Sequence, residues 1–137
     1  MYKIPEHLDV DMNISSPNGK GILRVFEGQN LPFSARRIFT IREGKGATRG
    51  RHAHLKCNQL LICLFGKIEV SIDDGCSTKR YMLYEDTSPI IIPAGYWAEQ
   101  RYLSENNVLM VICDQPYDEC DYIRDYNDYL KWKGASQ

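Results

Sequence analysis

The chain has 137 residues and a formal net charge of −1; 43% of its residues are hydrophobic and 26% are charged. These values are typical of one globular domain, so we expect residues 1–137 to form a single domain, and the near-neutral charge argues against a nucleic-acid partner. No apolar run approaches the roughly 20 residues that cross a bilayer, and the polar N-terminus is unlike a secretory signal. We therefore expect a cytoplasmic protein with no membrane partner.

Short β-strands separated by turn signals are predicted along most of the chain. Because only Phe65-Gly66 separates Gln59–Leu64 from Lys67–Ile72, we expect these two strands to pair as a hairpin. Many short strands at close spacing favour an all-β fold of the jelly-roll or sandwich type. The predicted strands are Gly21–Phe26, Arg37–Ile41, Gln59–Leu64, Lys67–Ile72, Arg80–Tyr84, Ile90–Ile92, Ala98–Tyr102 and Val108–Cys113.

The C-terminal part of the chain has a different periodicity. Tyr122, Tyr126 and Tyr129 recur at helical spacing together with Leu130, which predicts a short helix over Asp121–Lys131. We expect its aromatic stripe to be a packing surface rather than a ligand site.

Five cysteines occur at positions 57, 63, 76, 113 and 120, with no C-x-x-C pair among them. An odd number without this spacing is unlike a disulfide framework or a zinc site. Cys63 and Cys113 lie inside apolar stretches, so we expect them to be free thiols in the core.

A segment with two histidines carries the clearest chemical signal. From Gly46 to Gly66 the spacing is G-x5-H-x-H-x4-Q-x6-G, in which the histidines are His52 and His54 and the glutamine is Gln59. Residues two apart on a strand face the same way, so both imidazoles can share one pocket. The spacing resembles the first motif of the cupins, except that Gln59 stands where the metal-binding members have glutamate.

A second segment resembles the other cupin motif, P-x-G-x2-H, but lacks its histidine. It has the sequence P-A-G-Y-W-A at residues 93–98, so Ala98 stands at the ligand position. With Gln59 and Ala98 at two of the four usual ligand positions, too few donors remain for a catalytic metal. We therefore expect neither a metal nor another cofactor.

A histidine pair without a metal can still transfer protons. Imidazole has an unperturbed pKa of about 6.5, so one histidine can take a proton next to a carbonyl and return it near neutral pH. Two unrelated polar residues on a solvated strand are the alternative interpretation of an isolated H-x-H pair. The flanking glycines and the apolar strand that follows disfavour that alternative.

Several segments together resemble the dTDP-sugar 3,4-ketoisomerases, which are also called WxcM-like or FdtA-like proteins. Arg49–His54 is similar to the RG-x-HAH signature of that family, and Leu31–Arg37 matches its PFxxxR approach to the next strand. Tyr117–Tyr126 matches its YDExDYIRDY ending. The likeness spans roughly residues 18–130, and it implies a cupin-type jelly-roll β-barrel or sandwich with a short C-terminal helix.

The resemblance implies a homodimer that binds dTDP-4-oxo-6-deoxy-D-glucose and moves its ketone from C4 to C3, in deoxyamino-sugar synthesis for a bacterial surface polysaccharide such as O-antigen. By this match His52 would remove the C3 proton, and His54 would support the base or the resulting enediolate. Hydrogen-bond donors near the histidines would stabilise the oxyanion. Among them we favour Gln59 over Arg49 and Arg51, because strand alternation puts Arg51 on the face opposite His52.

The chain also departs from the family pattern. Phe39 stands where the family usually has an active-site tyrosine, and Lys20 and Ala98 occupy positions thought to influence the C4 stereochemistry, so galacto and gluco products both stay open. A non-catalytic or weakly active nucleotide-sugar-binding cupin is therefore the alternative function. Trp97, with its neighbour Tyr96, is a candidate for stacking on thymine or for packing at the barrel rim. The predicted substrate-binding residues are Lys20, Arg37, Phe39, Arg49, Gln59, Trp97 and Ala98.

Overall fold

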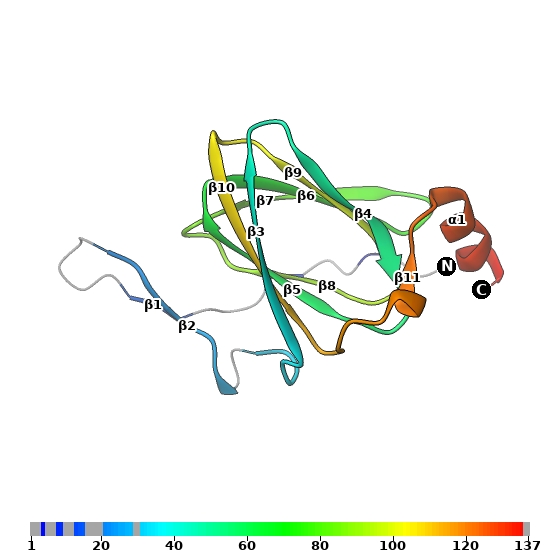
Figure 1. Cartoon of the computed structure of the whole chain (residues 1–137), viewed down its shortest axis with the longest axis horizontal. Coiled ribbons are helices and arrows are strands. Elements are labelled where there is room, and N and C mark those ends of the chain that lie inside the picture. Colours follow the sequence, from blue (N-terminus) through cyan, green and yellow to red (C-terminus); the bar gives the residue numbers. More distant parts are fainter. Residues whose placement is uncertain (1–3, 5–7, 10–12, 16–20, 29–30, 136–137) are drawn as a thin grey trace.

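The structure is a computed structural model, and it describes residues 4, 8–9, 13–15, 21–28 and 31–135. Figure 1 shows two layers of strands with the C-terminal helix α1 at one end. One sheet has the order β3-β10-β5-β8 and the other the order β11-β4-β9-β6-β7, while β1 and β2 form a separate pair. The elements are β1 (Asn13–Ser15), β2 (Leu23–Val25), β3 (Arg37–Gly44), β4 (Thr48–His54), β5 (Gln59–Phe65), β6 (Lys67–Asp73), β7 (Thr78–Tyr84), β8 (Ile90–Ile92), β9 (Trp97–Tyr102), β10 (Asn106–Cys113), β11 (Tyr122–Ile123) and α1 (Tyr126–Ala135). The predicted all-β sandwich with one C-terminal helix is confirmed.

Most of β5, in the four-stranded sheet, is buried on both faces, which explains its uninterrupted apolar run. Leu61 and Cys63 lie in the core between the sheets, whereas Leu60 and Ile62 belong to a second cluster on the outer face. By contrast, β6 buries one face only, so its apolar residues alternate with half-buried ones. The outer cluster is completed by Ile112 and by partly buried residues that include Phe26, Leu31 and Phe33.

The predicted hairpin between Gln59–Leu64 and Lys67–Ile72 is wrong. β5 pairs with β10 and β8, whereas β6 pairs with β7 and β9 in the other sheet. The chain changes sheets at Gly66, whose φ of 92° lies in the left-handed region that glycine tolerates. A Cβ at this position would lie 2.5 Å from the carbonyl oxygen of Asn106. Gly66 is therefore a corner between the layers and not a hairpin turn.

The buried side chain of Asn107 stabilises this corner through hydrogen bonds. Its side chain is fully buried and makes four hydrogen bonds to the backbone. The Oδ1 atom accepts from the N–H groups of Lys67 and Ser104, and the Nδ2 atom donates to the carbonyls of Glu43 and Ser104. One amide thus links the ends of β3, β6 and β10.

The C-terminal helix begins later than predicted, so the expected range Asp121–Lys131 is wrong at its start. Tyr122 is extended and belongs to β11, which pairs with β4. The side chain of Asp125 accepts a hydrogen bond from the N–H of Asp128 at 3.0 Å, which caps the helix that follows. As expected for its aromatic stripe, α1 packs Tyr129 against the outer face of β4 and β9. Among the described residues there is no helix with the length and hydrophobicity needed to cross a membrane.

We expect Asn107→Ala to lower the free energy of unfolding by roughly 2–4 kcal/mol, because buried polar groups left without a partner cost about 1–3 kcal/mol each. Chemical denaturation followed by circular dichroism measures the change. Asn106→Ala, at the exposed neighbouring position, is the matched control and should stay within ~0.5 kcal/mol of the wild type. Equal stabilities for the two variants would contradict the role of Asn107.

Candidate active site

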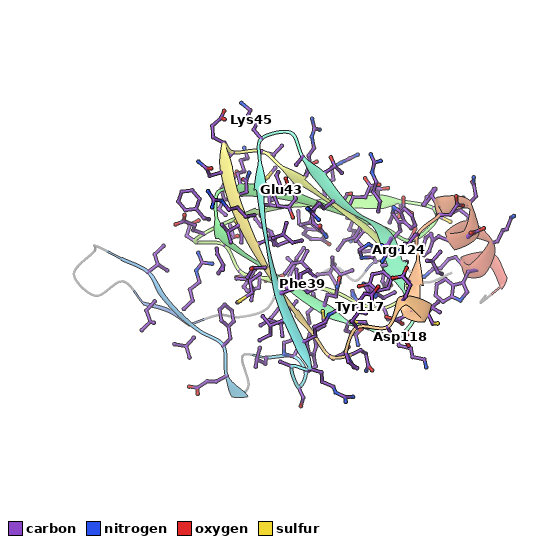
Figure 2. The ribbon with its side chains drawn as sticks, in the orientation of Figure 1. Phe39, Glu43, Lys45, Tyr117, Asp118 and Arg124 are labelled. Atoms are coloured by element: carbon purple, nitrogen blue, oxygen red, sulfur yellow. The ribbon has the colours of Figure 1, made fainter. Side chains whose placement is uncertain are left out.

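A cavity of about 320 Å³ lies between the two sheets beside the histidine pair. One wall comes from β3, β5 and β10, and the opposite wall comes from β4, β9 and β11. Figure 2 shows Phe39 on the first wall and Arg124 beyond the end of β11. A larger surface hollow of about 700 Å³ around Phe65 and Tyr84 contains neither histidine nor cysteine. The residues lining the cavity are Phe39, Ile41, Arg49, Gly50, His52, Gln59, Gln100, Val111, Tyr122 and Arg124.

A β-bulge in β4 decides which side chains face this cavity. Gly50 lies opposite Glu99 and His52 lies opposite Ala98, so Arg51 is an extra residue without a cross-strand partner. Gly50 and Arg51 both have positive φ values, 87° and 59°. Because of the bulge, Arg49 shares a face with His52, which simple alternation would not allow. The side chain of Arg51 points outward and is 69% exposed.

His52 is half-buried on the cavity wall and is held in its neutral form. Its Nδ1 atom donates a hydrogen bond to the carbonyl of Gly50 at 3.1 Å, since that oxygen can only accept. This bond leaves the lone pair of Nε2 free. Burial lowers the pKa of His52 to about 4; electrostatic repulsion from a proton on His54 and from the charges of Arg124 and Arg37 acts in the same direction, and the hydrogen bond to Gly50 opposes it. The imidazole is therefore uncharged at neutral pH.

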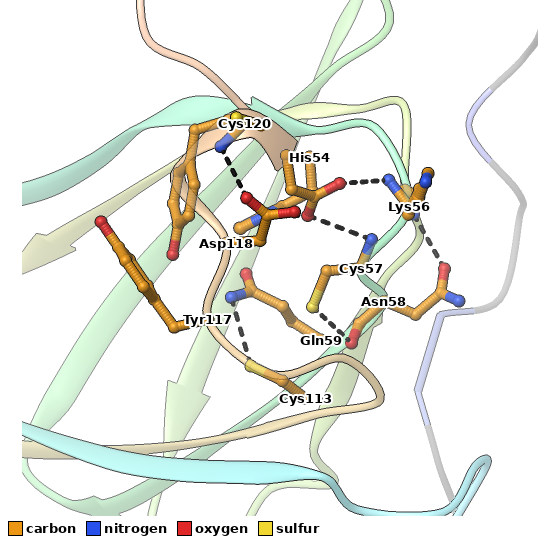
Figure 3. A network of polar contacts seen from close by, with 12 residues as sticks. His54, Lys56, Cys57, Asn58, Gln59, Cys113, Tyr117, Asp118 and Cys120 are labelled. Atoms are coloured by element: carbon orange, nitrogen blue, oxygen red, sulfur yellow. Dashed lines mark hydrogen bonds and ion pairs between the residues drawn. The ribbon is translucent and has the colours of Figure 1, made fainter.

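His54 lies behind His52 and does not line the cavity. Its ring is 4.9 Å from that of His52, edge to face, and only 5% of the residue is exposed. Its Nδ1 atom donates to Asp121 Oδ2 at 2.9 Å. Burial lowers the pKa of His54, although Asp121 opposes the shift. The carboxylate also accepts the N–H groups of Lys56 and Cys57, at 2.7 and 3.3 Å, on the turn that follows β4 (Figure 3).

Gln59 and Arg37 meet at a buried sulfur atom beside the cavity. Gln59 Nε2 lies 3.6 Å from Cys113 Sγ, a contact drawn in Figure 3, and Arg37 Nη2 lies 3.5 Å from the same atom. Hydrogen bonding from the neighbouring Cys57 thiol, from Gln59 and from Arg37 lowers the pKa of Cys113. Cys113 is thus a core residue, as expected. It also positions Gln59 and Arg37, which are both predicted substrate-binding residues.

Positive charge gathers around the cavity. Arg49 forms an ion pair with Glu43 at 2.7 Å, and Arg124 binds Glu119 through two hydrogen bonds of 2.7 and 2.9 Å. Arg37 sits at the edge without a carboxylate partner in the described part of the chain; its guanidinium lies 5.2 Å from the centre of the Phe39 ring. The site therefore suits an anionic ligand.

The structure brings most of the predicted site residues together but separates others from the cavity. Ala98 shares a face with His52 and is buried in the core beside it. Trp97 points to the opposite face, because it pairs with Ala53 and packs against Tyr129 at 5.7 Å. Trp97 therefore packs against the C-terminal helix and does not line the cavity, where the substrate contact was predicted. Lys20 lies outside the described residues.

One group of buried side chains has the composition of a metal site. His54, Cys57 and Asp121 offer ligand atoms that lie within 4.8 Å of one another. Asp121, however, already accepts three hydrogen bonds. The hydrogen bond to Cys113, together with burial, raises the pKa of Cys57, and cysteine binds metals as the thiolate. These three side chains therefore fit a hydrogen-bonded group that holds His54 in place better than they fit a metal centre.

Comparisons with known proteins place this fold and site in context. The chain matches the model of the family FdtA, described as WxcM-like, C-terminal, over residues 7–134. It is 36% identical over 112 residues to the TDP-4-oxo-6-deoxy-alpha-D-glucose-3,4-oxoisomerase of Aneurinibacillus thermoaerophilus, and the match covers 81% of each chain.

Solved structures of two ketoisomerases are also similar. A 3,4-ketoisomerase from Helicobacter canadensis has a TM-score of 0.82 and 31% identity, covering 93% of this chain and 95% of that one. The sugar 3,4-ketoisomerase QdtA from Thermoanaerobacterium thermosaccharolyticum, in complex with TDP, has a TM-score of 0.83 and 30% identity, with coverages of 94% and 93%.

This chain shares its two-sheet sandwich with these enzymes and has a cavity with a histidine on its wall between the two sheets, which defines a cupin-type isomerase. The chain belongs to the FdtA family, the WxcM-like dTDP-sugar 3,4-ketoisomerases. The family resemblance drawn from the RG-x-HAH and YDExDYIRDY segments and the predicted cupin-type fold are thereby confirmed.

Sequence reasoning missed several residues of the site. Tyr122 and Arg124 line the cavity and Asp121 anchors His54, yet the sequence pattern assigned them to the predicted helix and to the family-like YDExDYIRDY segment, not to the site. The sequence did hold a signal for these residues: their polar side chains interrupt a pattern that is otherwise helical. Gln100 faces the cavity from β9, two residues beyond Ala98, and alternation from Ala98 could have found it.

His52 should titrate at a pKa of about 4 instead of the usual 6.5. Because the folded-state pKa is the lower one, the unfolded chain binds more protons between these values, and stability should fall as the pH drops from 6.5 towards 4. An NMR titration of the histidine rings, with His52→Asn to assign the signal, measures the pKa directly. A midpoint close to the unperturbed value of about 6.5 would contradict the assigned effect of burial.

Proposed function

We propose that the protein is a metal-independent 3,4-ketoisomerase that converts dTDP-4-oxo-6-deoxy-D-glucose to the 3-oxo sugar through an enediolate. The observation that carries this proposal is the neutral imidazole of His52 on the cavity wall, with its Nδ1 atom occupied by Gly50 and its Nε2 atom free to accept a proton. The relatives support the substrate class: one is named for TDP-4-oxo-6-deoxy-glucose, and another holds TDP.

Proton transfer by His52 accounts for both steps at carbon, the removal of the C3 proton and the delivery of a proton to C4. Its Nε2 atom takes the proton from C3, the electron pair of that bond forms a C3=C4 double bond, and the C4 carbonyl oxygen becomes an oxyanion. The proton on the C3 oxygen then moves to the C4 oxygen, and the imidazolium delivers its proton to C4. The product has a ketone at C3 and a hydroxyl at C4. Because burial makes the imidazolium a strong acid, its return of the proton is favourable.

The other residues of the site position these groups. His54 supports the ring of His52 from behind, and Asp121 fixes the Nδ1–H tautomer of His54. Gln59 lines the cavity with an amide that can donate to a sugar oxygen. The three arginines around the cavity, at positions 37, 49 and 124, favour the diphosphate of the nucleotide and the anionic enediolate.

The same proposal extends to the oligomeric state, the cellular location and the biosynthetic role of the protein. We infer that the chain acts as a single-domain homodimer in the cytoplasm, in deoxyamino-sugar synthesis for a surface polysaccharide such as O-antigen. The family resemblance supports this setting, and the edge strands of a small sandwich need cover.

His52→Asn should reduce turnover by roughly 10²–10⁴-fold, the usual contribution of a general base, because asparagine keeps some hydrogen bonding but cannot take a proton. Affinity should change little, since most of the binding energy comes from the nucleotide. The measurement is turnover of the 4-oxo sugar in deuterated water, with deuterium followed at the sugar carbons. His54→Asn is the matched variant and should cost less, because His54 does not line the cavity.

The outcomes of this assay separate the candidate functions. Equal rates for the wild type and His52→Asn would remove His52 from the mechanism. Binding without turnover or deuterium exchange in the wild type would instead favour a nucleotide-sugar-binding protein. The observation behind that alternative is Phe39, which gives the cavity wall a ring without a hydroxyl.

Turnover should survive removal of divalent metals. At the cupin ligand positions Ala98 has no donor atom and Gln59 replaces the usual glutamate, so only His52 and His54 are left of the usual metal ligands. Dialysis against a strong chelator should leave kcat unchanged, and elemental analysis should find far less than one transition-metal ion per chain. A full equivalent of metal that is lost together with activity would contradict this proposal.

A further inference from the structure

Tyr122 provides the sole hydroxyl group among the ten residues that line the cavity. It lies in β11 directly opposite His54 of β4. Its ring centre is 5.0 Å from that of His52 and 4.4 Å from that of His54. The phenol therefore belongs to the same cluster as the base.

The hydrogen bonds of Tyr122 determine what its hydroxyl can do. Arg37 Nη2 donates to the Oη atom at 3.2 Å, so one lone pair of that oxygen is occupied and the hydroxyl hydrogen must point elsewhere. In the described part of the chain no acceptor for that hydrogen is found. The guanidinium polarises the O–H bond and strengthens it as a donor. The Arg124 guanidinium, 4.2 Å from the ring centre, helps to fix the ring.

Several other hydrogen-bond donors of the cavity are already engaged with protein groups. Arg49 and Arg124 bind Glu43 and Glu119, and Gln59 gives one N–H to Cys113. Phe39, on the facing wall, has no donor at all. The amide of Gln100 also lines the cavity, but Tyr122 is the hydroxyl-bearing residue whose ring lies directly against that of His52.

We propose that Tyr122 is a further catalytic residue, whose hydroxyl donates a hydrogen bond to the sugar oxygen on which negative charge develops. The inference rests on the proposed ketoisomerase function. When the C3–H electron pair moves into the C3=C4 bond, the C4 oxygen gains a full charge. A preorganised donor at that oxygen lowers the barrier more than it strengthens substrate binding.

Tyr122→Phe tests the proposal, because it keeps the ring contacts and removes only the hydroxyl. We expect kcat to fall by roughly 10²–10³-fold, as for the loss of one oxyanion donor, with little change in KM. Tyr117→Phe is the matched control, since this ring also lies near Arg37 but its hydroxyl bonds to Glu119 outside the cavity lining. It should keep the wild-type rate. Phe39→Tyr, added to Tyr122→Phe, should recover part of the rate by restoring a hydroxyl to the cavity.

Further substitutions at position 122 test the same hydroxyl group if Tyr122→Phe fails to fold. Two unnatural residues at position 122, 4-aminophenylalanine and 4-methylphenylalanine, both fill the space of the hydroxyl, but only the amine can donate a hydrogen bond, so kcat should be clearly higher with the amine. Equal kcat values for these two variants, or a wild-type rate in Tyr122→Phe while His52→Asn is impaired, overturn the role of Tyr122 and leave the proposed function intact. Absence of turnover in the wild type overturns both.

Discussion

The carboxylate of Asp121 is the contact on which the site depends. It accepts the N–H groups of Lys56 and Cys57 and the Nδ1–H of His54, while its own backbone carbonyl accepts the N–H of Leu55. Four hydrogen bonds therefore tie the C-terminal segment to the turn between β4 and β5. They align β11 with β4, and this alignment brings Tyr122 and Arg124 over the histidines. Without this anchor the cavity would lose one wall.

The second constraint is the β-bulge at Gly50 and Arg51. It lets β4 present Arg49 and His52 to the same cavity, with the Gly50 carbonyl turned to hold His52 Nδ1. A Cβ at Gly50 would lie 2.9 Å from the carbonyl of Ala98, so the close approach of β4 to β9 needs glycine at this place. The bulge therefore fixes both the direction and the tautomer of the base.

Local patterns predicted much of the fold, and long-range pairing decided the rest. The alternation of β6 and the apolar run of β5 predicted these strands correctly, and the H-x-H spacing pointed to His52, which lies on the cavity wall. The same patterns could not show that Gly66 moves the chain into the other sheet, because a corner and a hairpin turn both need a glycine. They also could not place Tyr122, whose helical spacing to Tyr126 is overridden by pairing with His54. Trp97 faces away because its register with Ala53 is set across β4 and β9.

The charges of the site explain how a histidine with so low a pKa can serve as a base. Arg37 and Arg124 are among the causes that lower the pKa of His52 in the free protein. In the proposed reaction, the diphosphate of the nucleotide would offset these positive charges and thereby raise the pKa of His52 when substrate is present. The arginines would then stabilise the enediolate as its charge develops. The arginines, which add to the effect of burial in keeping His52 neutral before binding, would thus favour proton removal once the anionic substrate is in place.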